Sequence, residues 1–258
     1  MSNLAFLKRP VVARKRRVFP STDPLAPEVR LALRSELFLI AHDDQTGREH
    51  LDRRFFCLGL AGSVLLELSL EQRIMIGGQY VIRDGRYIHD PGRILIKDPD
   101  CYGDPLTDAA ITLLNRTGGP LHVTDFIRQF ATLDLYDQVK GDMLATRVLR
   151  RTTYRKFWPF GKKDRYLAVR PFWAVQARTK VRDLAVPRKR NDPTPDFPDL
   201  QTIALTALVT ALGLTRNLFH TEPGVLHGRL MDIITGLHSS TARDVHAAIT
   251  PTNRRHVR

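Results

Sequence analysis

The sequence lacks any long apolar run. Its nearest candidate, Phe55 to Leu66, is cut off by Glu67 and is too short, because a transmembrane helix needs about 20 apolar residues. The amino terminus also lacks the apolar stretch of a secretory signal, since Lys8 and Arg9 follow almost at once. We therefore expect a cytoplasmic protein without a transmembrane segment.

Cysteine is scarce as well. The two cysteines, Cys57 and Cys101, form no CxxC pair, which argues against a disulfide-stapled scaffold. Glycine and proline number 16 each in 258 residues, too few for a collagen-like chain, and 43% apolar residues exclude a wholly disordered one. The length is sufficient for one large domain or two small ones.

Motifs of catalysis and metal binding are missing. The nine histidines show no HExxH or other metal spacing, Ser63 is not in a GxSxG motif, and Gly161-Lys162 lacks the rest of a P-loop. The acidic pairs at 43–44 and 98–100 are typical of turns. We expect neither an enzyme nor a metal or other cofactor.

Positive charge is present and unevenly placed. The net charge is +13, of which residues 1–20 carry +6 and residues 250–258 carry +3. Residues 147–165 carry +7 and residues 178–190 carry +5, so the remainder of the chain carries −8. Basic segments set into an acidic body indicate a polyanionic partner, either nucleic acid or an anionic membrane surface.

Apolar periodicity predicts mainly helices. A helix is expected over 29–41, and Asp52 caps a second that runs to Leu70 and is apolar nearly all round, as a central core helix would be. Gly59 and Gly62 would let a neighbouring helix approach it closely. Further helices are expected over the following ranges: 104–115, 124–130, 134–149, 171–184, 200–212, 225–237 and 241–249. Residues 187–199 are expected to form an exposed linker.

Two regions have β character. Short strands are expected at 73–76, 80–83, 86–88 and 93–96, with Asp84-Gly85 as a hairpin turn. Residues 152–169 predict a second hairpin, whose tip holds Phe157, Trp158 and Phe160.

The second hairpin combines aromatic and cationic side chains. The cations around its tip are Arg150, Arg151, Arg155, Lys156, Lys162, Lys163 and Arg165. Burying the three rings inside the protein would be costly because the charged neighbours would have to follow. A membrane interface suits both kinds of side chain, with the rings inserted at the headgroup boundary and the cations beside lipid phosphates.

Three alternatives remain open at this point. The rings could fold back onto a neighbouring helix, leaving the cations as a solvated rim. The hairpin could be the wing of a winged-helix-like DNA-binding regulator. The protein could also be an adaptor that binds a protein partner, which the sequence does not identify.

Several segments together resemble the Golgi phosphoprotein 3 family, in its actinobacterial branch. They are Ser35–Ala41, Asp43–Gly47, Leu60–Leu70, Arg73-Ile74, Asp104–Leu114, Val148–Arg151 before the aromatic-Trp-Pro hairpin, and Thr202–Leu214. The resemblance covers roughly residues 28–250. It implies a mainly α fold, a single globular helical domain around a central hydrophobic helix with short β-strands and a projecting β-hairpin. Residues 1–27 and 251–258 would then be flexible basic tails.

The resemblance also implies a function. It implies a peripheral membrane protein, here on the inner face of the membrane, that binds anionic lipid and specifically phosphatidylinositol 4-phosphate; eukaryotic relatives also retain Golgi enzymes. The positions that align with the family's phosphoinositide pocket are Asp52, Ala61, Leu133 and Tyr136. None is a cation, so headgroup specificity stays open. Arg53 and Arg54, beside Asp52, are either substitute phosphate ligands or a solvated helix start.

Overall fold

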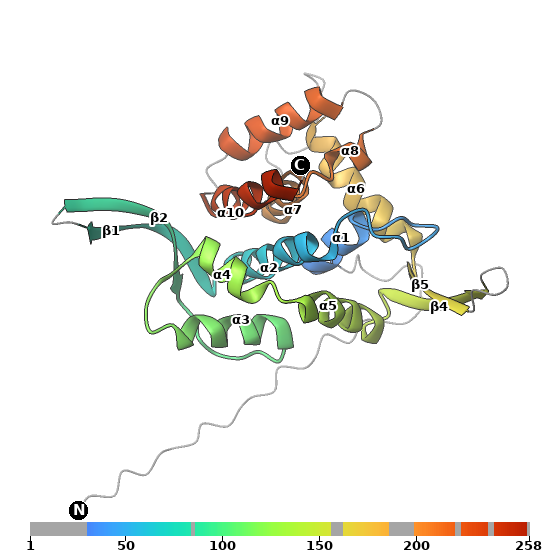
Figure 1. Cartoon of the computed structure of the whole chain (residues 1–258), viewed down its shortest axis with the longest axis horizontal. Coiled ribbons are helices and arrows are strands. Elements are labelled where there is room, and N and C mark those ends of the chain that lie inside the picture. The colour runs from blue at the N-terminus through green and yellow to red at the C-terminus, as the bar shows by residue number, and fades with distance from the viewer. Residues whose placement is uncertain are drawn as a thin grey trace, which may run out of the picture.

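The computed structural model describes residues 30–83, 86–155, 162–185, 199–219, 223–236 and 240–256. The fold is mainly α-helical with short antiparallel sheets, as the sequence predicts (Figure 1). The elements are α1 (Leu33–Ile40), α2 (Arg53–Leu70), β1 (Ile74–Arg83), β2 (Arg86–Ile96), α3 (Pro105–Arg116), β3 (Leu121–His122), α4 (Val123–Phe130), α5 (Leu133–Ala145), β4 (Leu149–Arg155), β5 (Lys162–Ala168), α6 (Pro171–Ala185), α7 (Leu200–Ala211), α8 (Thr215–Leu218), α9 (Pro223–Gly236) and α10 (Ser240–His256).

The helix α2 forms the core. Asp52 caps it as predicted, and every residue from Phe55 to Leu68 except Leu58 is buried. It packs against α1, α3, α4, α5, α7 and α10; in Figure 1, α7 and α10 lie above it and α3 and α5 lie below it. A methyl group added at Gly59 would lie 2.5 Å from a Leu212 side-chain carbon, and one at Gly62 would meet α7 and α10 at 3.0–3.1 Å. The predicted close approach of neighbouring helices at these glycines is confirmed.

A buried cluster of charge joins the helices around α2. Glu67 interrupts the apolar surface of α2, and Arg34 on α1 binds it through both its backbone N–H, at 2.8 Å, and its guanidinium. The same guanidinium reaches Asp104 at the start of α3 and lies 3.6 Å from Asp142 on α5. The interior thus contains one arginine that contacts acids from three further parts of the chain.

The first hairpin is longer than the sequence predicts. Four short strands were expected, but β1 and β2 are continuous, with paired residues from Ile74 and Ile96 to Arg83 and Arg86. The register shifts at Gly77/Gln79, opposite Pro91-Gly92. The residues that suggested breaks form a β-bulge instead, because a bulge accommodates both the missing proline N–H and the positive φ of Gly92. The turn residues Asp84 and Gly85 lie outside the described residues.

Two helix ends differ from expectation. The helix expected to end at Leu149 ends at Ala145, because Arg147 adopts a φ of 57° and the N–H of Val148 turns back to the carbonyl of Met143. Leu149 therefore begins β4. At the carboxy end, α10 continues beyond the expected end at Ile249 to His256, into the segment 251–258 that the sequence predicts as a tail. The predicted tail 1–27 and nearly all of the predicted linker 187–199 lie outside the described residues.

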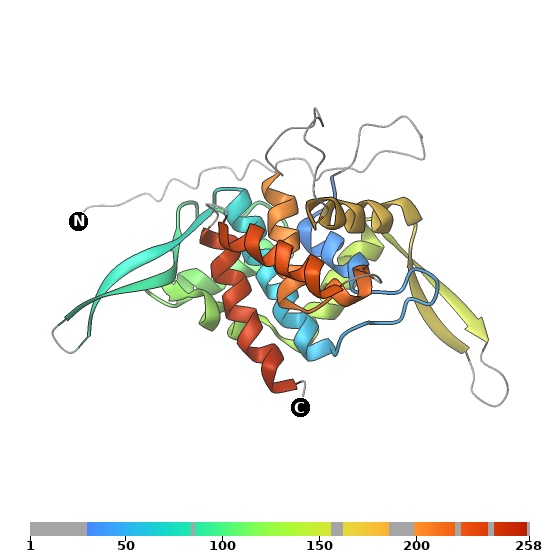
Figure 2. The same ribbon diagram turned by 90° about the horizontal axis from the view of Figure 1, so that it is seen from above.

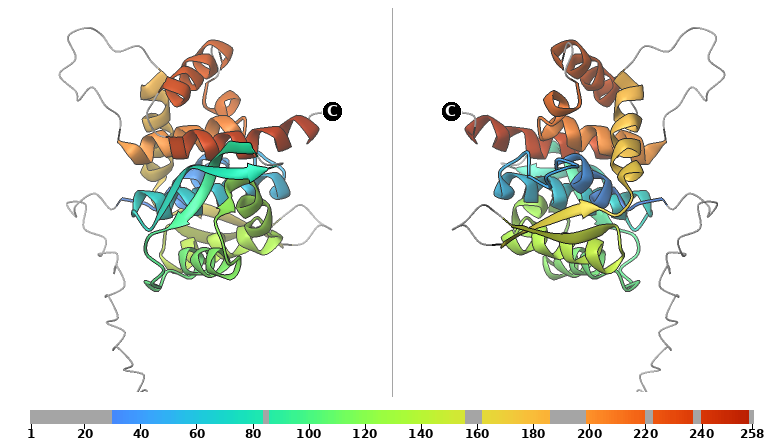
Figure 3. Two further views of the ribbon diagram at one scale, coloured as in Figure 1. Left: turned by 90° about the vertical axis from the view of Figure 1, so that its left-hand side faces the viewer. Right: turned by 90° about the vertical axis from the view of Figure 1, so that its right-hand side faces the viewer.

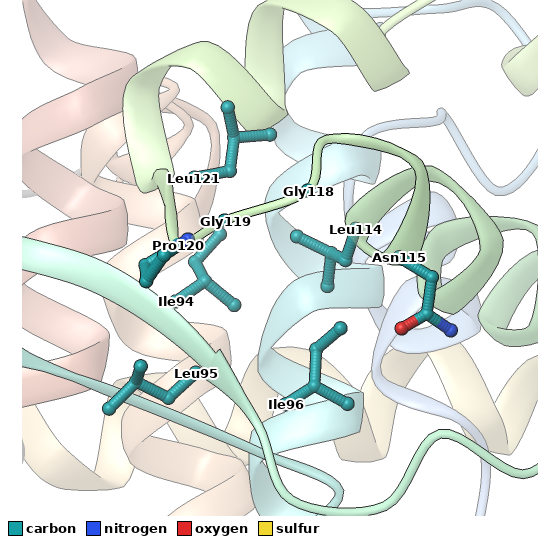
Figure 4. A pocket seen from close by; sticks show the side chains of 9 residues that line it. All are labelled: Ile94, Leu95, Ile96, Leu114, Asn115, Gly118, Gly119, Pro120 and Leu121. Carbon is teal, nitrogen blue, oxygen red and sulfur yellow. The ribbon is translucent and has the colours of Figure 1, made fainter.

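Two hairpins leave the helical body on opposite sides. Figures 1 and 2 place β1–β2 at one end of the molecule and β4–β5 at the other. An apolar pocket of about 230 Å³ lies near the first, between β2 and the segment from Leu114 to Leu121 (Figure 4). Its nine lining residues include no titratable side chain, so it offers no acid or base for catalysis.

Candidate functional site

The predicted hairpin is formed by β4 and β5. The strands pair in antiparallel register from Leu149 with Ala168 to Arg155 with Lys162. Arg150 and Arg151 on β4 are exposed, and because neighbouring strand residues point to opposite faces, one lies on each face of the hairpin. Arg151 is bonded to Asp164 across the strands, whereas Arg150 has no side-chain partner among the described residues.

The remaining predicted hairpin residues are only partly covered by the structure. Arg155, Lys162 and Lys163 are placed by their backbone in the two strands. Phe157, Trp158, Phe160 and Lys156 lie within 156–161, outside the described residues. The insertion of the three rings into a membrane therefore remains a prediction.

A tight turn supports the base of the hairpin. The carboxylate of Asp43 accepts bonds from the backbone N–H and the hydroxyl of Thr46, both at 2.7 Å, and these bonds lower the pKa of Asp43. The turn ends at Gly47, whose φ is 63°. A methyl group added there would lie 2.8 Å from the carbonyl oxygen of Tyr166 on β5. Backbone thus meets backbone where the hairpin leaves the body.

Two cations and two tyrosines connect the hairpin to the helices. The Arg53 guanidinium lies 4.2 Å from the centre of the Tyr136 ring. The Lys140 ammonium lies 5.1 Å from the same ring and 4.9 Å from the ring of Tyr166. These cation–π contacts bring together the start of α2, the helix α5 and strand β5.

Acids neutralise these two cations in place. Arg53 donates to Glu49 at 3.1 Å and lies 3.8 Å from Asp137, and Lys140 also pairs with Asp137. Arg54 is exposed, and its side chain has no partner among the described residues. Of the two arginines predicted at the start of α2, Arg53 is therefore already paired with carboxylates, whereas the Arg54 guanidinium is not.

The sequence alone did not reveal the buried layer under Arg53. Tyr136 is 4% exposed, and burial together with Glu49 raises the pKa of its phenol. His42 is 7% exposed and stacks on Phe38 with ring centres 4.1 Å apart. Its Nδ1 donates to the Phe38 carbonyl at 2.7 Å, and its Nε2 lies 3.1 Å from the Tyr136 hydroxyl. The spacing of Phe38 and His42, four residues apart at a helix end, was the signal that the sequence offered.

A comparison with known protein families identifies the family of the chain. The family model named Golgi phosphoprotein 3 (GPP34) matches residues 33–251, most of the chain. The chain belongs to the Golgi phosphoprotein 3 family. A search of curated proteins found no match. The predicted family is thereby confirmed, over nearly the range that the resemblance covered.

None of the four positions that the resemblance aligns with the family's phosphoinositide pocket carries a cationic side chain. Ala61 is fully buried and Tyr136 nearly so, and the side chain of Leu133 is outside the described set. Asp52 accepts the backbone N–H groups of Arg54 and Phe55, at 2.9 and 3.3 Å. Its carboxylate therefore occupies the helix N-terminus, where a phosphate would otherwise be favoured.

Within the described residues, no helix combines the length and the apolar character needed to cross a bilayer.

Proposed function

We propose that the protein is a non-enzymatic peripheral membrane protein that binds anionic lipid through the β4–β5 hairpin. One observation carries the proposal: a two-stranded hairpin leaves the helical body with exposed Arg150 and Arg151 at its base, while its sequence continues into Phe157, Trp158 and Phe160 (Figure 2). Membership of the Golgi phosphoprotein 3 family supports it.

The energies involved suit reversible binding. Burying an aromatic side chain contributes roughly 1.5–3 kcal/mol, and a cation near an anionic surface contributes about 1 kcal/mol. Together, the binding free energy contributed by the three rings and the cations exceeds the entropy cost of ordering a short loop. The cations of the hairpin are Arg150, Arg151, Arg155, Lys156, Lys162 and Lys163. Arg151 contributes less, because Asp164 already holds it.

Arg54 extends the cationic surface toward the start of α2. We propose it as a further phosphate donor, with Arg53 available only after exchange with Glu49. Phosphatidylinositol 4-phosphate, the lipid implied by the family resemblance, is included among the anionic lipids. Because Asp52 fills the helix N-terminus, we expect binding to follow surface charge more than headgroup identity.

Vesicle co-sedimentation of the full chain tests the proposal. The vesicles contain phosphatidylcholine with either phosphatidylserine or phosphatidylinositol 4-phosphate, matched in surface charge. Trp158→Ala/Phe160→Ala is expected to lower binding by roughly tenfold or more. The control is Val225→Ala, an exposed apolar residue on α9, which lies far from the hairpin in Figure 1. Undiminished binding by the double variant would contradict the hairpin as the binding element.

A salt series separates the lipid from the DNA alternative. Nucleic-acid binding through phosphate contacts falls steeply with salt, whereas ring insertion leaves a salt-resistant part. We expect vesicle binding of the wild-type chain to retain such a part and that of Trp158→Ala/Phe160→Ala to retain less of it. Tighter binding to duplex DNA than to vesicles throughout the series would favour the winged-helix alternative.

A further inference from the structure

The start of α6 carries an exposed apolar patch beside the hairpin. Val169, Phe172 and Val175 are 41%, 61% and 52% exposed. They are three of the seven exposed large apolar residues in the described part of the chain, and all lie between positions 169 and 175. Single exposed apolar residues are ordinary, but a cluster of this kind marks a surface that contacts something other than water.

The patch follows from the way α6 packs. The residues that face the body are small and buried: Ala174, Ala177, Val181 and Ala185. Phe172, Val175 and Thr179 have the three- and four-residue spacing of the opposite face and are exposed. The exposed Phe172 and Val175 therefore lie on the outward face of a helix whose inward face is packed against the body.

The polar surroundings of the patch suit an anionic bilayer. The Arg170 guanidinium lies 5.5 Å from the ring of half-buried Trp173, a pairing of cation and indole that suits the headgroup boundary. The sequence contains no acid between Asp164 and Asp183. A protein partner with an acidic rim would share this charge preference, but the adjoining hairpin favours lipid.

We propose that this α6 patch, Val169, Phe172 and Val175 with Arg170 and Trp173, is a second surface that contacts the anionic bilayer. The inference rests on the proposed function of the hairpin. Val169 follows β5 directly, and its N–H donates to the carbonyl of Val148 at 2.9 Å. The patch and the hairpin therefore share one base, from which α6 rises in the right-hand view of Figure 3.

The inference fixes how the hairpin meets the membrane. Strand residues rise about 3.3 Å each, so seven of them extend roughly 20 Å from the body. A hairpin standing upright on the bilayer would hold α6 about that far from the headgroups. The patch reaches lipid only if the hairpin lies along the interface, an orientation open to the hairpin because it leaves the body obliquely to α6 (Figure 2).

The two tryptophans of the chain distinguish these orientations. Trp158 lies between β4 and β5 and Trp173 lies on α6, so Trp158→Phe and Trp173→Phe each leave one reporter. Both variants are mixed with anionic vesicles whose phosphatidylcholine carries brominated acyl chains, which quench indoles in contact with them. We expect quenching of Trp173 as well as of Trp158. Quenching of Trp158 alone overturns the inference and leaves the proposed function standing; quenching of neither removes both.

Substitutions provide the second measurement. Phe172→Gln/Val175→Gln, at positions more than half exposed, is expected to fold normally and to bind anionic vesicles roughly tenfold more weakly. Leu200→Gln/Val225→Gln removes two equally exposed apolar side chains from α7 and α9 and is expected to bind like the wild type. Equal vesicle binding by both double variants overturns the inference. So does a change in oligomeric mass confined to the α6 variant with vesicle binding unchanged, because the patch would then join two copies of the chain.

Discussion

His42 is a histidine held without charge. It lies under Arg53 in the aromatic layer of Phe38, Phe56 and Tyr136, and burial lowers its pKa to about 4. Its Nδ1 carries the proton, because the Phe38 carbonyl can only accept. Protonating Nε2 would place a cation in this apolar layer. Nε2 could then no longer accept a hydrogen bond from the Tyr136 hydroxyl.

The lowered pKa makes stability depend on pH. In the unfolded chain His42 becomes protonated below about pH 6.5, whereas in the folded chain it stays neutral down to about pH 4. The free energy of unfolding should therefore fall as the pH drops through this interval, by about 3 kcal/mol in total, with no contribution from His42 above it. Urea titrations across this range measure the fall.

A variant assigns that fall to His42. His42→Gln keeps a hydrogen-bonding side chain and cannot titrate, so its free energy of unfolding should lose most of the dependence between pH 6.5 and 4. If His42→Gln shows the same fall as the wild type, another group is responsible.

Between elements, the turn at 43–47 acts as a support for β5. Gly47 occupies the left-handed region of backbone space, and its Cα faces the backbone of Tyr166. Both ends of that contact are backbone, so neither can turn aside as a side chain would. The direction in which the hairpin leaves the body depends on this contact as well as on the strand pairing.

Gly47→Ala should lower the free energy of unfolding by about 2–3 kcal/mol. The left-handed conformation alone costs alanine about 1–2 kcal/mol, and the added methyl group would lie 2.8 Å from a carbonyl oxygen. Gly118→Ala is the control, since Gly118 has a similar φ of 66° and nothing within 4 Å of the new carbon. We expect Gly118→Ala to cost only the conformational part, as measured by urea unfolding. Equal losses in the two variants would show that the contact with β5 contributes nothing.

The elements that were predicted correctly are those whose signals are local. A cap at Asp52 followed by an apolar run fixes α2, and Asp104-Pro105 fixes the start of α3, because the interactions involved lie within a few residues. The failures lie where tertiary pairing overrides a local signal. Gly77-Gly78 and Pro91-Gly92 suggested strand breaks, yet they lie on paired strands at a bulge, between the pairs Gly77–Arg93 and Gln79–Asp90, which no local pattern reveals.

In the candidate site, too, sequence reasoning reached the groups that are neighbours in the chain and missed the contacts between distant residues. The cations of the hairpin were predicted because they are neighbours in sequence. The contact of Arg53 with Tyr136 and the partnership of His42 with Tyr136 join residues more than 80 positions apart, and only the packing of α1, α2 and α5 creates them. The approach of Asp137 to Arg53 was out of reach for the same reason, whereas Glu49, four residues before Arg53, is a local partner.

At the scale of the whole molecule, Arg34 connects the helices that surround the core. It joins α1 to Glu67 near the C-terminal end of the central helix, to Asp104 at the start of α3 and to Asp142 on α5. Burial raises the pKa of Glu67, and the Arg34 guanidinium opposes that rise. Without Arg34, the central helix would retain a buried carboxylate with no cation beside it.

Arg34→Met should therefore lower the free energy of unfolding by about 3–5 kcal/mol at neutral pH, because it leaves Glu67 charged and unpaired. The loss should shrink as the pH falls, since a carboxyl group whose pKa is raised by folding regains stability once protonated. Arg34→Met/Glu67→Leu should recover most of the loss, because it removes the buried charge along with its partner.

Arg30→Met, which breaks an ion pair with Asp199 that is more than half exposed, should cost less than about 1 kcal/mol. If the double variant is as unstable as Arg34→Met at every pH, then Arg34 stabilises the junction by packing its side chain among α1, α2, α3 and α5, and the charge of Glu67 has no part in it.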